Sequence, residues 1–250
     1  RRATYDLIGL PPTPEDVRTF VEDPESDREA FAKVVERLLA SPHYGERWGR
    51  HWLDVVRYAD TAGFANDFQR PNAWRYRDYV IESFNNDKPY DQFVKEQIAG
   101  DLLPAESLNQ AREQLTACGF LMLGPHNYEL QDKELLRMEV VDEQITTLGK
   151  AFLGMTIGCA RCHDHKFDPI AMEDFYSFTA YFRNTTQKAM DGNVADTPPV
   201  VYIPKPEDED RWRALGEKIA AVQKERGAYR AKAMPLMEAW AAGARGKPYV

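Results

Sequence analysis

The sequence has 250 residues, enough for one large domain or for one domain with an appendage, and its apolar fraction of 43% is typical of a globular protein. A formal net charge of -8 and an isoelectric point near 5.3 argue against a nucleic-acid partner, which would need a basic surface. No uninterrupted apolar run approaches the roughly 18 residues of a membrane span. The chain begins at Arg1 without an initiator methionine, so we expect it to be a segment of a longer polypeptide.

The first residues of the chain predict helices with clear start signals. Thr13 followed by Pro14 is a capping residue with proline at the first helical position, which predicts a short helix. Ser26 and Glu29 form a capping box, and apolar residues then recur at helical spacing until Pro42. The chain is therefore expected to open with two capped helices.

Helical spacing of apolar side chains continues as far as residue 182. The pair Asp168-Pro169 interrupts it once, before a last helix that is rich in aromatic residues. We expect a mainly α fold, with a multi-helix domain over residues 1–184. The expected helices cover residues 48–59, 72–84, 91–100, 108–121, 135–152 and 175–182.

The character of the sequence changes after residue 184. Turn residues and the pair Pro198-Pro199 predict a linker over residues 185–205, with a short strand over 200–203. Residues 206–250 are charged and helical, and Leu215, Ile219 and Val222 lie on a narrow apolar seam. This pattern predicts a C-terminal helical arm, either a helical hairpin or a coiled coil, interrupted near Pro235.

One segment has a spacing that prescribes a chemistry. Cys159 and Cys162 are separated by two residues and followed by His163, the C-x-x-C-H attachment signature of a c-type haem. Each thiol can add to one vinyl group of a porphyrin, and the imidazole then becomes an axial ligand of the iron. With three cysteines and five histidines in the chain, the pattern arises by chance only about once in a thousand cases. The sequence therefore predicts one covalently bound haem c.

Two other interpretations of the same segment remain open. Cys159, Cys162, His163 and His165 are four zinc ligands within seven residues, although no second cysteine pair completes the usual structural zinc site. A thioredoxin-like redox pair is disfavoured because no βαβ pattern surrounds the cysteines. Cys118 lies in an apolar segment and is expected to be an inert, buried thiol.

A haem that transfers electrons also needs a sixth iron ligand and partners for its propionates. We expect His51 to be that ligand, because its helix also carries Trp48 and Trp52; the alternative is a structural histidine bonded to a neighbouring group. His165 follows the proximal ligand too closely to reach the opposite face. Arg57 and Arg161 are the expected propionate partners. The methionines are rival sixth ligands, namely Met122, Met138, Met155 and Met172.

Four separated blocks resemble, in the same order, the planctomycete-type cytochrome C proteins and in particular their middle domain of unknown function. The resemblance covers about residues 1 to 182 and implies a largely helical domain that carries one haem c, is exported, and is set in a longer polypeptide. Cys118 departs from the family pattern, which tends to have threonine there, and this weakens any role for the thiol. The blocks are DLIGLPPTPEDV, ERWGRHWLDVVRYADTAGF, NAWRYRDYVIESFNNDKPYDQFVKEQIAGDLLP and CARCHDHKFDPI.

The expected function is one-electron transfer by a c-type cytochrome domain of an exported, periplasmic or cell-surface protein. The electron would pass to a redox partner protein or to adjacent domains of the same polypeptide. A second hypothesis is a haem enzyme with an open iron site that turns over peroxide. A third is a noncatalytic interaction module held together by haem or zinc.

Overall fold

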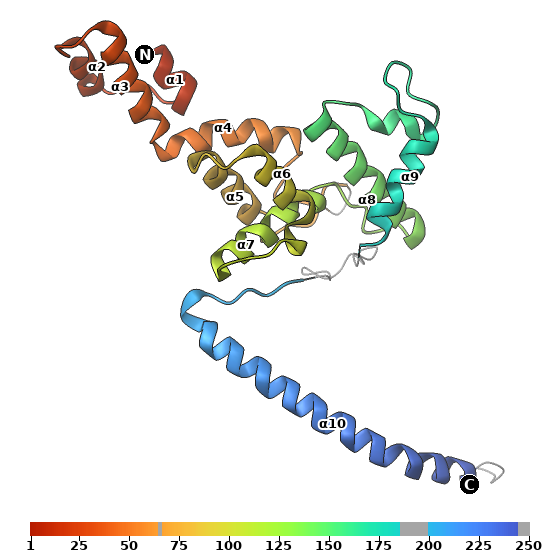
Figure 1. The fold of residues 1–250 in the computed structure, drawn as a ribbon. Coiled ribbons are helices and arrows are strands. Elements are labelled where there is room, and N and C mark those ends of the chain that lie inside the picture. Colours follow the sequence, from red (N-terminus) through yellow and green to blue (C-terminus); the bar gives the residue numbers. More distant parts are fainter. Residues whose placement is uncertain (65–66, 186–199, 245–250) are drawn as a thin grey trace. The chain divides into compact units, whose positions relative to one another are not determined.

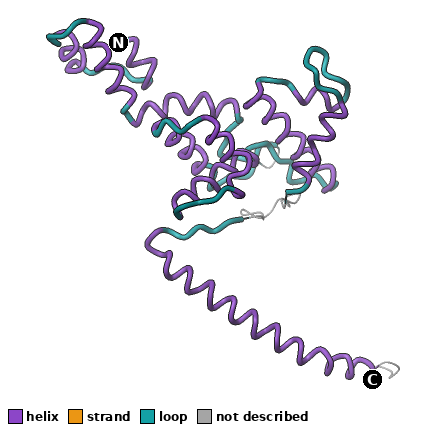
Figure 2. Tube along the Cα trace, viewed as in Figure 1, coloured by secondary structure: helices purple, strands orange, loops and turns teal. Residues whose placement is uncertain are grey.

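The computed structural model describes residues 1–64, 67–185 and 200–244, and its chain divides into two compact units, Arg1–Val200 and Val201–Val250. Within the described residues the regular elements are helices, without a strand (Figure 2). This confirms the mainly α prediction. The first unit contains α1 to α9 and the second contains α10 (Figure 1).

The first unit is an assembly of helices, with longer connections over residues 56–73, 118–132 and 149–171. The 3-10 turns Gly100–Leu102 and Cys118–Met122 follow α6 and α7, respectively. The nine α-helices are α1 (Arg2–Ile8), α2 (Pro14–Val21), α3 (Asp27–Leu39), α4 (Pro42–Val55), α5 (Trp74–Asn85), α6 (Tyr90–Ala99), α7 (Leu108–Ala117), α8 (Lys133–Leu148) and α9 (Met172–Arg183).

The predicted helix starts are confirmed by the caps. The Thr13 hydroxyl accepts a hydrogen bond from the backbone N–H of Asp16, and Ser26 does the same for Glu29, so both capping boxes form. The expectation that the next helix extends to Ala59 is wrong, since α4 ends at Val55. Arg57 has a φ of 57°, a left-handed conformation that turns the chain out of the helix.

α4 is joined to the core of the unit through Trp52. Its indole N–H lies 3.0 Å from both the Tyr76 hydroxyl and the Gln97 side-chain oxygen, and its ring contacts Phe93 and Phe152 at centroid distances of 5.0 and 5.5 Å. These contacts link α4 to α5, to α6 and to the turn that follows α8. The surrounding core includes the fully buried Val80, Phe120 and Ile145.

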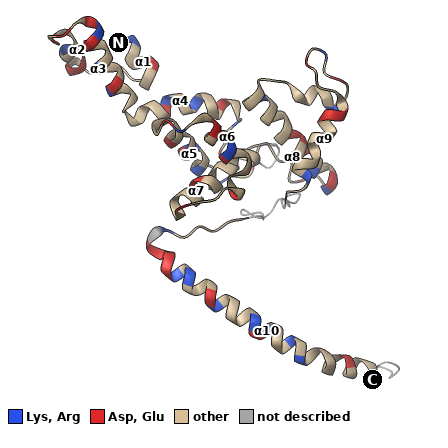
Figure 3. Ribbon diagram, in the orientation of Figure 1, with Lys and Arg blue, Asp and Glu red and all other residues tan. Residues whose placement is uncertain are grey.

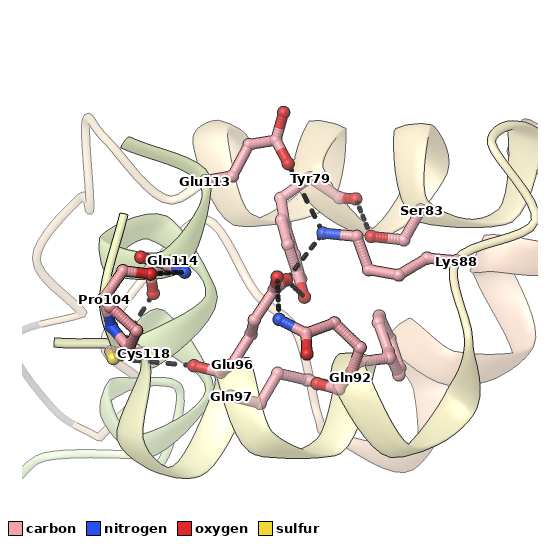
Figure 4. A network of polar contacts seen from close by, with 11 residues as sticks. Tyr79, Ser83, Lys88, Gln92, Glu96, Gln97, Pro104, Glu113, Gln114 and Cys118 are labelled. Atoms are coloured by element: carbon pink, nitrogen blue, oxygen red, sulfur yellow. Dashed lines mark hydrogen bonds and ion pairs between the residues drawn. The ribbon is translucent and has the colours of Figure 1, made fainter. Parts of the chain in front are cut away.

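A buried ion pair lies between α5 and α6 (Figure 4). Lys88 Nζ lies 2.5 Å from Glu96 Oε2, and the Glu96 side chain is 4% exposed. Tyr79 and Gln92 also donate hydrogen bonds to this carboxylate, at 2.8 and 2.9 Å. Burial alone would raise the pKa of Glu96, but these three donors hold it below its ordinary value. The buried Glu96 carboxylate is therefore stabilised in its charged form by Lys88, Tyr79 and Gln92.

The second unit contains the 3-10 turn Pro206–Asp208 and α10 (Glu209–Ala244). The predicted strand over 200–203 is wrong: these residues are irregular, and no neighbouring strand is present in the described part to pair with them. The predicted hairpin does not form, because one helix continues through Pro235. Residues 186–199 of the expected linker lie outside the described residues. Among the helices of the described ranges, none combines the length and apolar character that crossing a membrane requires.

Candidate functional site

The C-x-x-C-H segment lies between α8 and α9. α8 continues into the π-helical turn η3 (Gly149–Leu153), which ends at Gly154 with a φ of 64°, and the 3-10 turn η4 (Ile157–Arg161) follows. A side chain at Gly149 would lie 2.7 Å from Ile157, so glycine allows η4 to pack closely against the end of α8. η4 also packs on α9. The motif is thereby held between two helices.

The two thiols share one face of η4. A 3-10 helix has three residues per turn, so side chains three positions apart eclipse each other. Ile157 and Ala160 form the buried face, with exposures of 6% and 0%, whereas Cys159 and Cys162 are exposed and free. The backbone N–H of Cys162 donates to the carbonyl of Cys159 at 3.4 Å. The turn therefore presents both sulfur atoms on the same solvent-facing side.

The exposed imidazole of His163 has a defined tautomer. Its Nδ1 lies 2.8 Å from the backbone carbonyl oxygen of Asp164. A carbonyl oxygen only accepts, so Nδ1 carries the proton and the lone pair of the neutral ring is on Nε2. Histidines that bind metals typically donate their other ring N–H in this way. His163 is therefore oriented to offer Nε2 as a ligand.

His165 has a different role, because its ring forms hydrogen bonds that stabilise the loop after the motif. Its Nδ1 accepts the backbone N–H of Asp168 at 2.8 Å and lies 3.3 Å from a carboxylate oxygen of the same residue. Nε2 must then carry the proton, which it donates to the Thr156 hydroxyl at 3.0 Å. Of the three partners that the sequence suggests for His165, a propionate, a backbone carbonyl or Asp168, the structure shows Asp168. Neither ring nitrogen of His165 keeps a lone pair for zinc.

Side chains from both flanking helices fix the position of the motif. Arg161 Nη1 lies 2.9 Å from a carboxylate oxygen of Asp142 on α8, and the Tyr176 hydroxyl of α9 donates to the Arg161 carbonyl at 3.0 Å. The Asp164 carboxylate accepts the first N–H of α9, that of Met172, at 2.8 Å. The loop from η4 to α9 is thus tied at both ends.

An apolar pocket of about 400 Å³, within the size range of small-molecule and cofactor sites, reaches the Ile157 side of η4 and is not lined by Cys159, Cys162 or His163. Ile157 of η4 and Phe175 and Phe178 of α9 belong to its wall. Large apolar side chains are also exposed around it and along the motif loop. These are Leu153 (56%), Phe167 (82%), Met172 (40%), Tyr176 (50%) and Tyr181 (74%).

Comparison with protein families identifies a match over residues 1–187 to the family described as "PSCyt2: Protein of unknown function (DUF1549)". The chain belongs to this family. The match covers the same part of the chain as the resemblance to planctomycete-type cytochrome domains. No curated protein and no solved structure matches the chain.

In this PSCyt2 domain the other predicted site residues make contacts of their own. His51 is exposed on α4, with its ring 5.5 Å from that of Trp48. No hydrogen bond or ring contact described in the structure joins it to the motif. Arg57 forms an ion pair with Glu143 of α8, and Arg161 is paired with Asp142. Arg161 is part of the motif itself, and no described contact joins Arg57 or His51 to it.

Two other reactive-looking groups of the PSCyt2 domain are structural. Cys118 is partly buried, its Sγ lies 3.5 Å from the Gln114 carbonyl, and burial raises the pKa of its thiol. The Lys88–Glu96 pair is enclosed by its own hydrogen-bond donors (Figure 4). In the described ranges, His, Cys, Asp and Glu side chains nowhere gather in threes around a point that could hold a metal ion.

Sequence reasoning missed the residues that position the motif in this family member. Asp142, Thr156 and Asp164 carried no signal, because their partners are recognised only once α8, η4 and α9 are packed. From sequence, the aromatic stripe of residues 175–182 favours an ordinary core helix over a wall for a bound ring. Phe175 and Phe182 are buried in the core, and Phe175 and Phe178 also line the pocket.

Proposed function

We propose that this domain is a c-type cytochrome, with one haem attached through Cys159 and Cys162, and that it transfers one electron at a time. The observation that carries the proposal is the geometry of η4 and the residue after it. Both thiols face solvent on one side of the turn, and the adjacent His163 is fixed in the tautomer that leaves Nε2 for the iron. Attachment requires this combination of groups.

The surroundings of the motif fit a flat apolar cofactor. Leu153, Phe167 and Tyr181 leave large apolar surfaces in water, at a cost of about 25 cal/mol for each Å². A porphyrin bound at the thiols would cover part of this surface. When bound, the haem supplies reversible one-electron chemistry at the iron, and the chain sets its potential through the axial ligands and the polarity of the site.

Each side chain around the motif has a distinct role in this proposal. Cys159 and Cys162 fix the porphyrin, and His163 supplies the proximal nitrogen. Arg161, whose ion pair with Asp142 is half exposed, can turn its guanidinium towards a propionate, and Arg57 is the second predicted partner. His51 remains the predicted sixth ligand. Met155 is its main rival because it lines the apolar pocket beside the motif.

The proposal also implies a compartment and a partner. Haem c is attached where reduced thiols and haem meet outside the cytoplasm, so we propose an exported protein, periplasmic or at the cell surface. The electron donor or acceptor would be a redox partner protein or an adjacent domain of the same polypeptide. The apolar, exposed edge around Phe167 and Tyr181 is compatible with such a docking step.

A second function is favoured by the position of His51. Since no described contact joins His51 to the motif, the iron could keep an open sixth position and bind peroxide or another small oxidant. That site would make the domain a haem enzyme. In both cases Cys159 and Cys162 would hold the haem, and His163 would supply the proximal nitrogen.

Visible spectra of the reduced protein, with and without carbon monoxide, test the proposal. A six-coordinate, low-spin spectrum that carbon monoxide leaves unchanged supports electron transfer. A spectrum that changes with carbon monoxide supports the enzyme. The absence of a Soret band in protein made with a cytochrome maturation system would contradict both, and would leave a noncatalytic module.

A further inference from the structure

The C-terminal helix α10 exposes an ordered apolar surface. All side chains of residues 209–240 are exposed, and the helix of 36 residues is roughly 54 Å long at 1.5 Å per residue. Most of its large exposed apolar residues recur at intervals of three, four or seven. Seven follow these intervals, namely Trp212, Leu215, Ile219, Val222, Tyr229, Leu236 and Trp240, and two exposed methionines, Met234 and Met237, lie outside them.

These residues define a heptad repeat. With Trp212 at position a, the a positions are 212, 219, 226, 233 and 240, and the d positions are 215, 222, 229, 236 and 243. Of these ten positions, only Arg226 is charged, Ala233 is small, and Gly243 at the end of the helix has no side chain. An a/d seam sustained over four heptads is the pattern of a coiled coil. The remaining positions carry both signs of charge, as Figure 3 shows along α10.

The composition of α10 indicates that it needs a partner. Pro235 lies inside the helix, where proline costs about 3 kcal/mol, and Gly216 and Gly227 each cost about 1 kcal/mol relative to alanine. All three lie outside the a/d seam. A helix with these interruptions gains its stability from burying an apolar face rather than from its own propensity.

The charges beside the seam point to a second copy of this chain. In a parallel, in-register pair, a g residue faces the e residue of the next heptad on the partner and flanks the partner's following a residue. Glu225 is at g, Arg226 at a and Arg230 at e. Each Glu225 would then lie between Arg226 and Arg230 of the other copy, twice by symmetry. The one charged residue of the seam thereby gains a carboxylate neighbour on the other copy.

We infer that α10 joins two copies of this chain as a parallel two-stranded coiled coil. A single polar a residue fixes the register of such a pair at some cost in stability, and Arg226 has this role. In an antiparallel pair, g residues face g residues, which separates Glu225 from Arg230 of the other copy. The inference does not depend on the haem, because the seam and its charges lie entirely within α10.

Light scattering and sedimentation of the full chain measure the expected dimer. Glu225→Lys places one cation of the other copy beside each Arg226, two in the dimer, and should weaken the dimer by at least about tenfold in dissociation constant. Glu217→Lys makes the same change of charge at an outward f position and should leave the dimer as it is. A monomeric wild type at the highest soluble concentration, or an equal effect of both variants, would overturn the inference.

Cysteine trapping measures the orientation. Under oxidising conditions, Val222→Cys at a d position should yield a covalent dimer, because parallel in-register helices bring the two introduced sulfur atoms together. Lys224→Cys, on the outward face, should not. Both variants are made with Cys118→Ser so that no other free thiol competes in the haem-bound protein. Failure of Val222→Cys to cross-link a protein that sediments as a dimer would refute the parallel arrangement.

Discussion

His163 illustrates how a single hydrogen bond decides what a residue can do. Its Nδ1 donates to the Asp164 carbonyl, so the ring offers Nε2, whereas His165, two positions later, uses both nitrogens within the loop. Both residues are histidines, so the sequence alone could not show which ring keeps a lone pair free. The distinction arises from the backbone path after η4, which turns the Asp168 N–H towards one ring and a carbonyl towards the other.

The sixth ligand is tested by a pair of variants on α4. If His51 ligates the iron, His51→Ala converts the spectrum towards high spin and allows carbon monoxide to bind the ferrous form. His43 lies on the same helix, where its ring bonds Glu46, and His43→Ala is the matched control. If His51→Ala leaves the spectrum unchanged, His51 is structural, and a near-infrared sulfur-to-iron band lost in Met155→Leu would assign Met155.

His126 makes the stability of the domain depend on pH. Its side chain is buried, Nδ1 accepts from Arg70 at 2.9 Å, and burial together with the Arg70 charge lowers its pKa to about 4. The unfolded chain binds this proton near pH 6.5, so stability is lost as pH falls from about 6.5 to 4.

The expected loss in free energy of unfolding over that range is roughly 3 kcal/mol. Urea unfolding at a series of pH values measures it. The variant His126→Asn should flatten the slope between these pH values, whereas His43→Asn, at an exposed histidine, should retain it. A wild-type slope that persists in His126→Asn would assign the effect to other groups.

At the scale of elements, a buried charge pair joins Lys88, in the turn between α5 and α6, to Glu96 of α6. Removing one partner of such a pair leaves the other charge uncompensated, which costs about 3 to 5 kcal/mol. Lys88→Met should therefore strongly destabilise the domain in urea unfolding, since Glu96 keeps no cation. Lys95→Met removes the exposed pair with Asp91 on the same helix and should cost less than about 1 kcal/mol. Similar effects of the two variants would contradict the burial argument.

Helix starts were predictable from sequence, and helix ends were less so. Thr13 and Ser26 specify local caps, and local signals are enough to recognise them. The left-handed Arg57 and the π turn Gly149–Leu153 are not encoded in apolar spacing, because they depend on packing against distant segments. The C-x-x-C-H motif could be recognised from sequence because its residues are contiguous. The side chains that hold it in place come from α8 and α9 and could not be recognised in the same way.

At the scale of the whole molecule, the two units carry different features. The first belongs to the PSCyt2 family and carries the thiols, His163 and the adjacent apolar pocket. The second presents the heptad seam of α10. The expected interruption near Pro235 does not occur, because α10 continues through this residue as one helix.

The central claim is covalent haem attachment, and intact mass tests it most directly. Protein exported from a host with a cytochrome maturation system should gain the mass of one haem and keep its colour through acid-acetone extraction. The double variant Cys159→Ala with Cys162→Ala, and wild-type protein made in the cytoplasm without maturation factors, should both lack the covalent haem. A wild type that is exported with the maturation system and still has the mass of the bare polypeptide would contradict the account.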